Sequence, residues 1–274
     1  MREMAIAAIL FDLDDTLVVD GAAVDAALLA TCAHAQAVYG LDPQALAQAV
    51  RAQARALWRA APTLAYCRAI GLSSAEGLWA RFAGNYDPQL QALRAWAPLY
   101  RRTAWAAALA AFGVWDSRLA ERLAVSFPIQ RRARHWAFPE VKTTLGALQG
   151  GYRLALVTNG VPDLQREKLT GAGLAPYFTT VVVSGEIGVG KPDPRIFIRA
   201  LADVAVDAAD AVFVGDHRVR DIGGAQQAGL RGIWINRQGG DDDGGAAVTP
   251  DGEIARVANT ASSCCSPMTT CATS

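Results

Sequence analysis

Seven polar residues in this sequence follow short apolar runs and have side chains that could do chemistry together. The run Ala5–Phe11 leads into two aspartates, and the run Tyr152–Thr158 ends in a threonine that an asparagine follows. The full set is Asp12, Asp14, Thr158, Asn159, Lys191, Asp216 and Asp221. Ligands of an open parallel sheet gather at the carboxyl ends of its strands. If the apolar runs are neighbouring strands, we expect these residues to converge on one site.

The chemistry follows from the residue types. Four carboxylates close together raise one another's pKa and favour a bound cation. Hard oxygen ligands of this kind suit Mg²⁺, which takes one or two carboxylates together with water and substrate phosphate. A carboxylate can also act as a nucleophile, and a hydroxyl and an ammonium can stabilise the oxygens of a transferring phosphoryl group. The set predicts Mg²⁺-dependent phosphoryl chemistry.

A second interpretation of the lysine is a nucleotide-binding loop. Gly185 to Lys191 follows the pattern G-x-x-x-x-G-K after the apolar run VVV. The next residue of such a loop is Ser or Thr, whose hydroxyl holds Mg²⁺. Here it is Pro192, which has no hydroxyl. The sequence therefore argues against a P-loop nucleotide hydrolase.

The elements that would position these residues alternate between strands and helices. After Pro139, strands are expected at 152–158, 181–183, 211–215 and 232–236, with helical segments between them. This alternation predicts an α/β fold, a Rossmann-like parallel sheet with helices on both faces. The first strand, Ala5–Phe11, must join this sheet across a gap of more than a hundred residues.

The segment between the first strand and the rest of the sheet has a helical sequence pattern, and it is much longer than the usual connection between α/β elements. Apolar residues recur at spacings of three and four, which predicts four to six helices. Breaks are expected at Pro62, Gly71, Pro88, Pro98 and Gly113. We therefore expect a core at residues 1–20 and 137–240, an inserted all-helical cap at 21–136, and a poorly ordered C-terminal tail at 241–274.

Composition limits the possible partners and location. The 274 residues carry a formal net charge of zero, which argues against a protein that coats nucleic acid or an acidic membrane. Residues 21–140 hold thirteen Arg, no Lys and seven Asp or Glu, a balance of +6. The arginines there are expected mostly on a solvated face and the tryptophans in the core. The five cysteines form no zinc or disulfide pattern, no signal peptide is evident and no segment is expected to span a membrane. A cytoplasmic protein fits best.

Four stretches in order resemble the motifs of the haloacid dehalogenase (HAD) superfamily. They are FDLDDTL, VTNG, KPDP and VGDHRVRDIGGAQQAG. The helical segment after the first motif resembles that superfamily's C1-type cap. The similarity runs from Ala5 to about Asn236, and the stretch SGEIGVGKPDPRIF is closest in texture to the phosphatase branch.

The resemblance implies a role for each residue. Asp12 would be the nucleophile and a metal ligand, and Asp14 would be the acid and base, with its carbonyl on Mg²⁺. Thr158 and the backbone of Asn159 would bind the phosphoryl group, and Lys191 would balance its charge. The metal would also be held by Asp216 and Asp221.

Two positions depart from the common pattern: Asp15 stands where many relatives have Gly, and His217 follows Asp216, where it is expected to be a loop residue. Dehalogenases of this superfamily have a first motif that resembles D-x-Y, whereas this sequence has Asp14 at the third position. Asp14 therefore argues against dehalogenase activity. The alternatives are a sugar phosphomutase or a dehalogenase of the same superfamily, or a non-catalytic binding module. We expect a cytoplasmic phosphatase of a small phosphorylated metabolite, with no nucleic acid or membrane partner.

Overall fold

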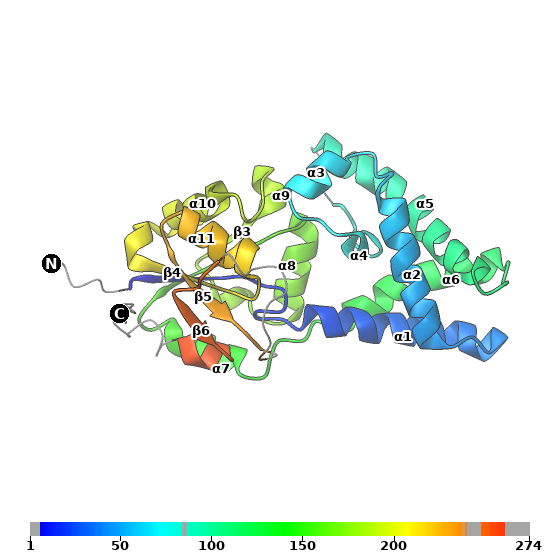
Figure 1. The fold of residues 1–274 in the computed structure, drawn as a ribbon, viewed down its shortest axis with the longest axis horizontal. Helices are drawn as coiled ribbons and strands as arrows, with labels where there is room; N and C mark the ends of the chain where they lie inside the picture. Colours follow the sequence, from blue (N-terminus) through cyan, green and yellow to red (C-terminus); the bar gives the residue numbers. More distant parts are fainter. Residues whose placement is uncertain (1–5, 84–86, 238, 240–247, 261–274) are drawn as a thin grey trace, which may run out of the picture.

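The computed structural model describes residues 6–83, 87–237, 239 and 248–260. A six-stranded parallel sheet and a helical unit lie side by side along the long axis of the molecule (Figure 1). The strands lie in the order β3-β2-β1-β4-β5-β6. Their bounds are β1 Ala8–Phe11, β2 Arg153–Thr158, β3 Thr180–Val183, β4 Ala211–Gly215, β5 Arg231–Ile235 and β6 Gly252–Ile254. The predicted parallel α/β sheet is confirmed.

The central strand β1 is buried along its whole length because both faces of the sheet are covered. One face packs its apolar side chains with those of α7 (Val141–Leu148) and α8 (Pro162–Gly171). The other face packs with α10 (Pro194–Val204). Short elements complete the core: α9 Ser184–Ile187, α11 Gly224–Gln227, and the helical turns η1 Ala175–Tyr177, η2 Ala208–Asp210, η3 Arg218–Gly223 and η4 Val257–Asn259.

Between β1 and α7, the described part of the chain forms six helices, which we call the helical insert (residues 20–132). They are α1 Asp20–Tyr39, α2 Pro43–Trp58, α3 Leu64–Ala69, α4 Ser74–Gly77, α5 Pro88–Ala110 and α6 Ser117–Arg132. Pro98 lies inside α5 and does not end it, contrary to expectation. Because proline has no amide N–H, the carbonyl of Arg94 loses its hydrogen-bond donor in the helix. Arg94 and Pro98 are both exposed, so water can satisfy that carbonyl.

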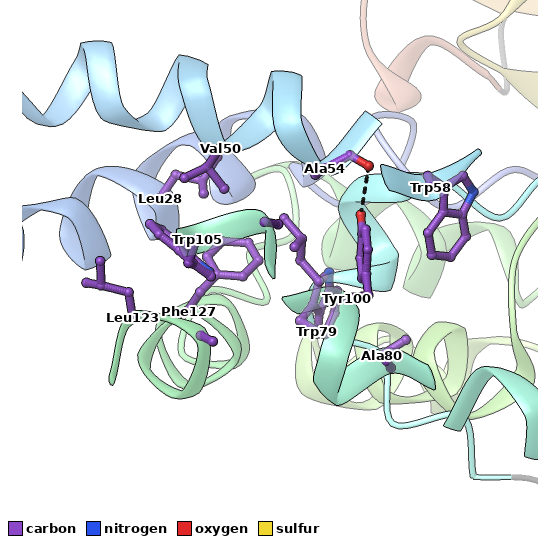
Figure 2. Packing of buried hydrophobic residues seen from close by; sticks show 14 of the residues in the cluster. Leu28, Val50, Ala54, Trp58, Trp79, Ala80, Tyr100, Trp105, Leu123 and Phe127 are labelled. Atoms are coloured by element: carbon purple, nitrogen blue, oxygen red, sulfur yellow. Dashed lines mark hydrogen bonds between the residues drawn. The ribbon is translucent and has the colours of Figure 1, made fainter. Parts of the chain in front are cut away.

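The insert has its own apolar core (Figure 2). The ring of Tyr100 packs against that of Trp58, with 5.3 Å between the ring centroids. The Tyr100 hydroxyl donates to the carbonyl of Ser74 at 2.7 Å and to that of Ala54 at 3.3 Å. The expectation that the tryptophans are core residues holds for Trp58, Trp79 and Trp105. It is wrong for Trp115 and Trp136, which are 85% and 44% exposed.

Helix α1 is long and apolar enough, by length and composition, to pass for a membrane span, although no such segment was expected. Here its buried residues, such as Ala27, Leu28 and Cys32, belong to the core of the insert. Cys32 and Cys67 are buried free thiols. The tail cysteines Cys264, Cys265 and Cys271 lie outside the described residues.

Backbone hydrogen bonds join the insert to the core at both of its sides. Where the chain enters and leaves it, the amide of Val19 donates to the carbonyl of Trp136 at 2.8 Å, and that of Phe138 donates to Leu17 at 3.0 Å. On the far side, the loop after α3 contacts the loops after β2 and β3. There the carbonyl of Ile70 accepts from the amide of Gly160 at 3.0 Å and from the Ser184 hydroxyl at 2.6 Å. The insert therefore rests on the edge where the strands end.

Part of the expected tail is instead part of the sheet. Strand β6 pairs in parallel with β5. The segment before it is held by Gln226, which donates to the carbonyl of Thr249 at 2.8 Å, and by Asp251, which accepts from the amide of Gly232 at 2.7 Å. The prediction of a poorly ordered tail is wrong for residues 248–260, because a three-residue strand gives too little pattern to recognise. Residues 241–247 and 261–274 lie outside the described part of the chain.

Candidate active site

The structure brings all seven predicted residues to one cleft of about 210 Å³. The cleft lies at the carboxyl ends of the strands, between the sheet and the helical insert. From the insert it is lined by Asp20, Val24, Gly71, Ser73, Ala75 and Glu76. The convergence follows from strand order: β2, β1 and β4 are neighbours, so the residues that follow them share one edge of the sheet.

Lys191 is buried at the centre of the cleft and is shared by two carboxylates. Its ammonium contacts Asp12 Oδ1 and lies 2.8 Å from Asp221 Oδ1. Burial opposes its charge, but these two carboxylates outweigh that effect and raise the pKa of Lys191. Burial and the nearby Asp221 raise the pKa of Asp12 against the opposing effect of Lys191. The lysine therefore remains a cation beside the predicted nucleophile.

Asn159 fixes the backbone of that lysine. Its side-chain Oδ1 accepts from the Lys191 amide at 2.8 Å, and its Nδ2 donates to the Lys191 carbonyl at 3.0 Å. Only a backbone contribution to phosphate binding was expected from Asn159, so this side-chain role was missed. Thr158, the last residue of β2, is buried and lines the cleft beside it.

Three carboxylates are placed to share a cation. Ligand oxygens of Asp12, Asp216 and Asp221 all lie within 4.8 Å of one another. Burial, followed by the charges of Asp12 and Asp221, raises the pKa of Asp216 to about 9. This surplus of negative charge is the condition that a divalent cation relieves, and an all-oxygen donor set suits Mg²⁺. The residues present therefore fit the expected ion.

Asp14 faces a different set of partners. Its Oδ2 accepts from the ammonium of Lys168 at 2.8 Å and from Gln165 Nε2 at 3.4 Å. Burial, followed by the charge of Asp20, raises the pKa of Asp14 to about 8. A carboxyl with that pKa keeps its proton for much of the time at neutral pH, which suits a general acid.

Lys168 is the main functional candidate that the sequence analysis missed. It is 1% exposed and lies within 3.3 Å of carboxylate oxygens of Asp14, Asp20 and Glu76. Burial alone would lower its pKa, but the three carboxylates raise it above the ordinary value. A signal was present: Lys168 and Gln165 share one face of α8 with the buried Leu164 and Leu169.

The expectation that the arginines of the insert lie mostly on a solvated face is confirmed, and the buried Arg131 is the exception. It is 1% exposed, pairs with Asp20 and lies 4.6 Å from the centre of the Trp79 ring. Burial opposes the charge of Asp20, but Lys168 and Arg131 outweigh it and lower the pKa of Asp20. We call Asp14, Asp20, Glu76, Arg131 and Lys168 the bridging cluster, because its members come from both the insert and the core.

Two departures from the common motif have local structural roles. Asp15 has a φ of 57°, in the left-handed region that favours glycine. Its Oδ1 accepts from the amides of Asp20 at 2.9 Å and Gly21 at 3.0 Å, so it caps the start of α1. His217 caps η3, accepting from the Arg220 amide at 3.2 Å.

Comparisons with known proteins agree with this geometry. Residues 6–229 match a family of haloacid dehalogenase-like hydrolases. The chain is 44% identical over 230 residues to a phosphoserine phosphatase of Thermus thermophilus, which covers 84% of this chain and 88% of that protein.

Two solved structures share the fold. A HAD-hydrolase of Bacillus subtilis, YfnB, superposes with a TM-score of 0.64 at 24% identity, covering 93% of this chain and 97% of that one. A 2-haloacid dehalogenase of Pseudomonas syringae superposes with a TM-score of 0.56 at 31% identity, covering 94% and 97%. Together with the family match across most of its length, these similarities show that the chain belongs to the haloacid dehalogenase-like hydrolases.

Proposed function

We propose that the protein is a Mg²⁺-dependent phosphatase that hydrolyses a small phosphate monoester through an aspartyl-phosphate on Asp12. The observation that carries this proposal is the placement of Asp12 between a buried lysine and two further carboxylates, with Asp14 two residues away in the same cleft. The 44% identity to a phosphoserine phosphatase supports the same activity.

In the first step, an oxygen of Asp12 attacks phosphorus and the bond from phosphorus to the ester oxygen breaks. Asp14 gives its proton to that departing oxygen, so the product leaves as an alcohol. Lys191 and Thr158 stabilise the charge on the phosphoryl oxygens. The raised pKa of Asp14, about 8, supports its role as the proton donor.

In the second step, water attacks the phosphorus of the aspartyl-phosphate and Asp14 accepts a proton from that water. The bond from phosphorus to Asp12 breaks, which releases inorganic phosphate and restores the carboxylate. Asp12, Asp216 and Asp221, with the Asp14 carbonyl, are the residues that would hold Mg²⁺. Its positive charge would offset the carboxylates and bind the phosphate oxygens.

The helical insert would serve as a cap over the cleft. It supplies six of the lining residues and meets the core at the strand ends, which supports a role in selecting the leaving group. Opening would admit substrate and closing would exclude water. The cleft is small, which favours a short leaving group.

The test is phosphate release from phosphoserine, short-chain, sugar and nucleoside phosphates, with Mg²⁺ and with a chelator. We expect Mg²⁺-dependent release that Asp12→Asn abolishes. Asp203→Asn, which removes an exposed carboxylate paired with Arg199, is the control and should leave release unchanged. Release that survives Asp12→Asn would contradict the mechanism.

A dehalogenase is the second candidate, because the similar Pseudomonas syringae structure is a 2-haloacid dehalogenase. Asp14 argues against it, since displacement of halide from carbon needs no proton donor at that position. Halide release from 2-haloacids by the intact protein, without phosphate release from any ester, would favour that activity.

A further inference from the structure

The bridging cluster connects the helical insert to Asp14. Lys168 projects from α8 of the core, and its three carboxylate partners come from three separate segments. Asp14 at 2.8 Å follows β1, Asp20 at 3.1 Å begins α1, and Glu76 at 3.3 Å lies on α4 of the insert. One ammonium therefore contacts Asp14 and the insert at the same time.

Glu76 is itself held in place from the insert side. Its Oε2 accepts from the Ser73 amide at 3.0 Å, and its own amide donates to the Ser73 hydroxyl oxygen at 3.2 Å, which together form the capping box of α4. The Ser73 hydroxyl also donates to Oε2 at 2.9 Å. The other oxygen of Glu76, Oε1, accepts from Lys168 and, at 3.0 Å, from Gln165. The position of Glu76 relative to Lys168 thus depends on how α4 is seated on the core.

Gln165 extends the same network to the loop that follows β2. Its Nε2 lies 2.6 Å from the Asn159 carbonyl, 3.0 Å from Glu76 and 3.4 Å from Asp14. Lys168 also lies 5.8 Å from the centre of the Trp79 ring, which belongs to the core of the insert. The side chains around Asp14 are therefore buried and partnered on both sides of the interface.

Resting on the function proposed above, we infer that Lys168 and Glu76 are positioning residues for Asp14. Lys168 holds the Asp14 carboxyl by one oxygen, so that the other oxygen points to the leaving group. Glu76 completes the set of partners of Lys168 only when α4 lies against the core. Proton donation by Asp14 thereby depends on the seating of the insert. The alternative is that this ion cluster only stabilises the interface.

The two explanations differ in how the leaving group matters. Breaking the bond to an alkyl ester oxygen needs the proton of Asp14, whereas p-nitrophenolate departs without one. The ratio kcat/KM reports events up to the first phosphoryl transfer, so it isolates this step. A positioning defect should therefore lower kcat/KM for an alkyl phosphate much more than for p-nitrophenyl phosphate. A structural defect lowers both alike.

The experiment measures kcat/KM for 2-aminoethyl phosphate and p-nitrophenyl phosphate in the wild type and four variants. In Lys168→Met we expect kcat/KM to fall roughly 100-fold with the alkyl ester, which is a typical contribution of general acid catalysis to the rate. With the aryl ester we expect kcat/KM to fall less than about 5-fold. Lys168→Arg keeps the charge and should recover part of the loss. Arg166→Met is the matched control, because Arg166 lies on the same helix but is exposed and pairs with Glu186 at 2.6 Å.

Glu76→Gln tests the cluster without removing the buried cation. The glutamine can still accept from the Ser73 amide, but its amide nitrogen then faces Lys168 and cannot accept from it. We expect the same selective loss of kcat/KM, roughly 5- to 10-fold with the alkyl ester, within the range of one typical hydrogen bond. If Lys168→Met does not fold, as judged by circular dichroism, Glu76→Gln carries the comparison.

Equal losses with both esters, or no loss with the alkyl ester, would overturn the inference and leave the proposed phosphatase intact. Absence of phosphate release from any ester by the wild type would remove the proposed function, and the inference with it.

Discussion

The side-chain amide of Asn159 pairs with the backbone of Lys191 through two hydrogen bonds, of 2.8 and 3.0 Å. The residue that follows β2 therefore fixes the loop that follows β3, although 32 positions separate them. The Lys191 ammonium in turn contacts Asp12 and Asp221. The lysine that follows β3 is thus linked to the residues that follow β1, β2 and β4.

Removal of the lysine charge should show how much these contacts matter. In Lys191→Met, two buried carboxylates lose their cation, so we expect the free energy of unfolding to fall by about 3–5 kcal/mol and phosphate release to fall by at least ~100-fold. Chemical denaturation and initial rates measure the two effects. Lys142→Met, on the exposed face of α7, is the control and should change neither. A fully active Lys191→Met would contradict the assigned role.

Gly71 tests the contact between the insert and Asn159. A Cβ at Gly71 would lie 2.5 Å from Asn159 Nδ2, and the backbone φ is +71°. Gly71→Ala should therefore lower activity as well as stability, because it displaces the residue that holds Lys191. Gly113→Ala has the same type of strain, with a φ of +75°, but no atom within 4 Å. It should cost roughly 1 kcal/mol of stability and leave activity unchanged.

The residues at the strand ends could be predicted because they follow recognisable apolar runs, and parallel strands place such residues at one edge. The bridging cluster could not, since Lys168 lies within helix α8 and not at the end of a strand. Its place on the apolar face of α8 hints at burial, but the carboxylates that pair with it there come from distant segments. Strand β6 was missed because its three residues carry no period of their own.

Asp216 should show a conflict between stability and function. In the metal-free protein its pKa is raised to about 9, whereas an unfolded aspartate ionises near 3.8. Between these values the unfolded chain has lost this proton and the folded protein keeps it, so folded stability declines as pH rises. Asp216→Asn removes that penalty. With a chelator at pH 8, we expect the melting temperature to rise by roughly 3 °C.

Mg²⁺ provides the complementary measurement for Asp216. Adding Mg²⁺ should raise the melting temperature of the wild type, because ligands that bind only the folded state stabilise it. It should have little effect on Asp216→Asn, which should also be inactive. A melting temperature for this variant below that of the chelated wild type would contradict the electrostatic account.

His135 should make stability depend on pH in the opposite sense. Burial, followed by the positive charge of Arg131, lowers the pKa of His135 from its ordinary value of 6.5. The positive charges of Lys168 and Arg132 lower it further, and the carboxylate of Glu167, at 3.8 Å, opposes the shift. As pH falls, this histidine therefore takes up a proton more readily in the unfolded chain than in the folded protein. The stability that is present above pH 6.5 is consequently lost below it. In His135→Phe, the free energy of unfolding measured by urea denaturation should fall less between about pH 7 and 5 than it does in the wild type. The exposed His34, changed to Gln, should leave that slope as in the wild type.

The pairing of β6 with β5 sets where the chain can be shortened. A chain ending at residue 240 would leave β5 as an open edge with unpaired backbone groups, a surface that invites self-association. It would also lose Val248, whose carbonyl accepts from Arg218 at 2.8 Å, next to the turn that carries Asp221. Expression of soluble protein should therefore tolerate removal of residues after 260 but not after 240, and a purification tag belongs beyond Thr260.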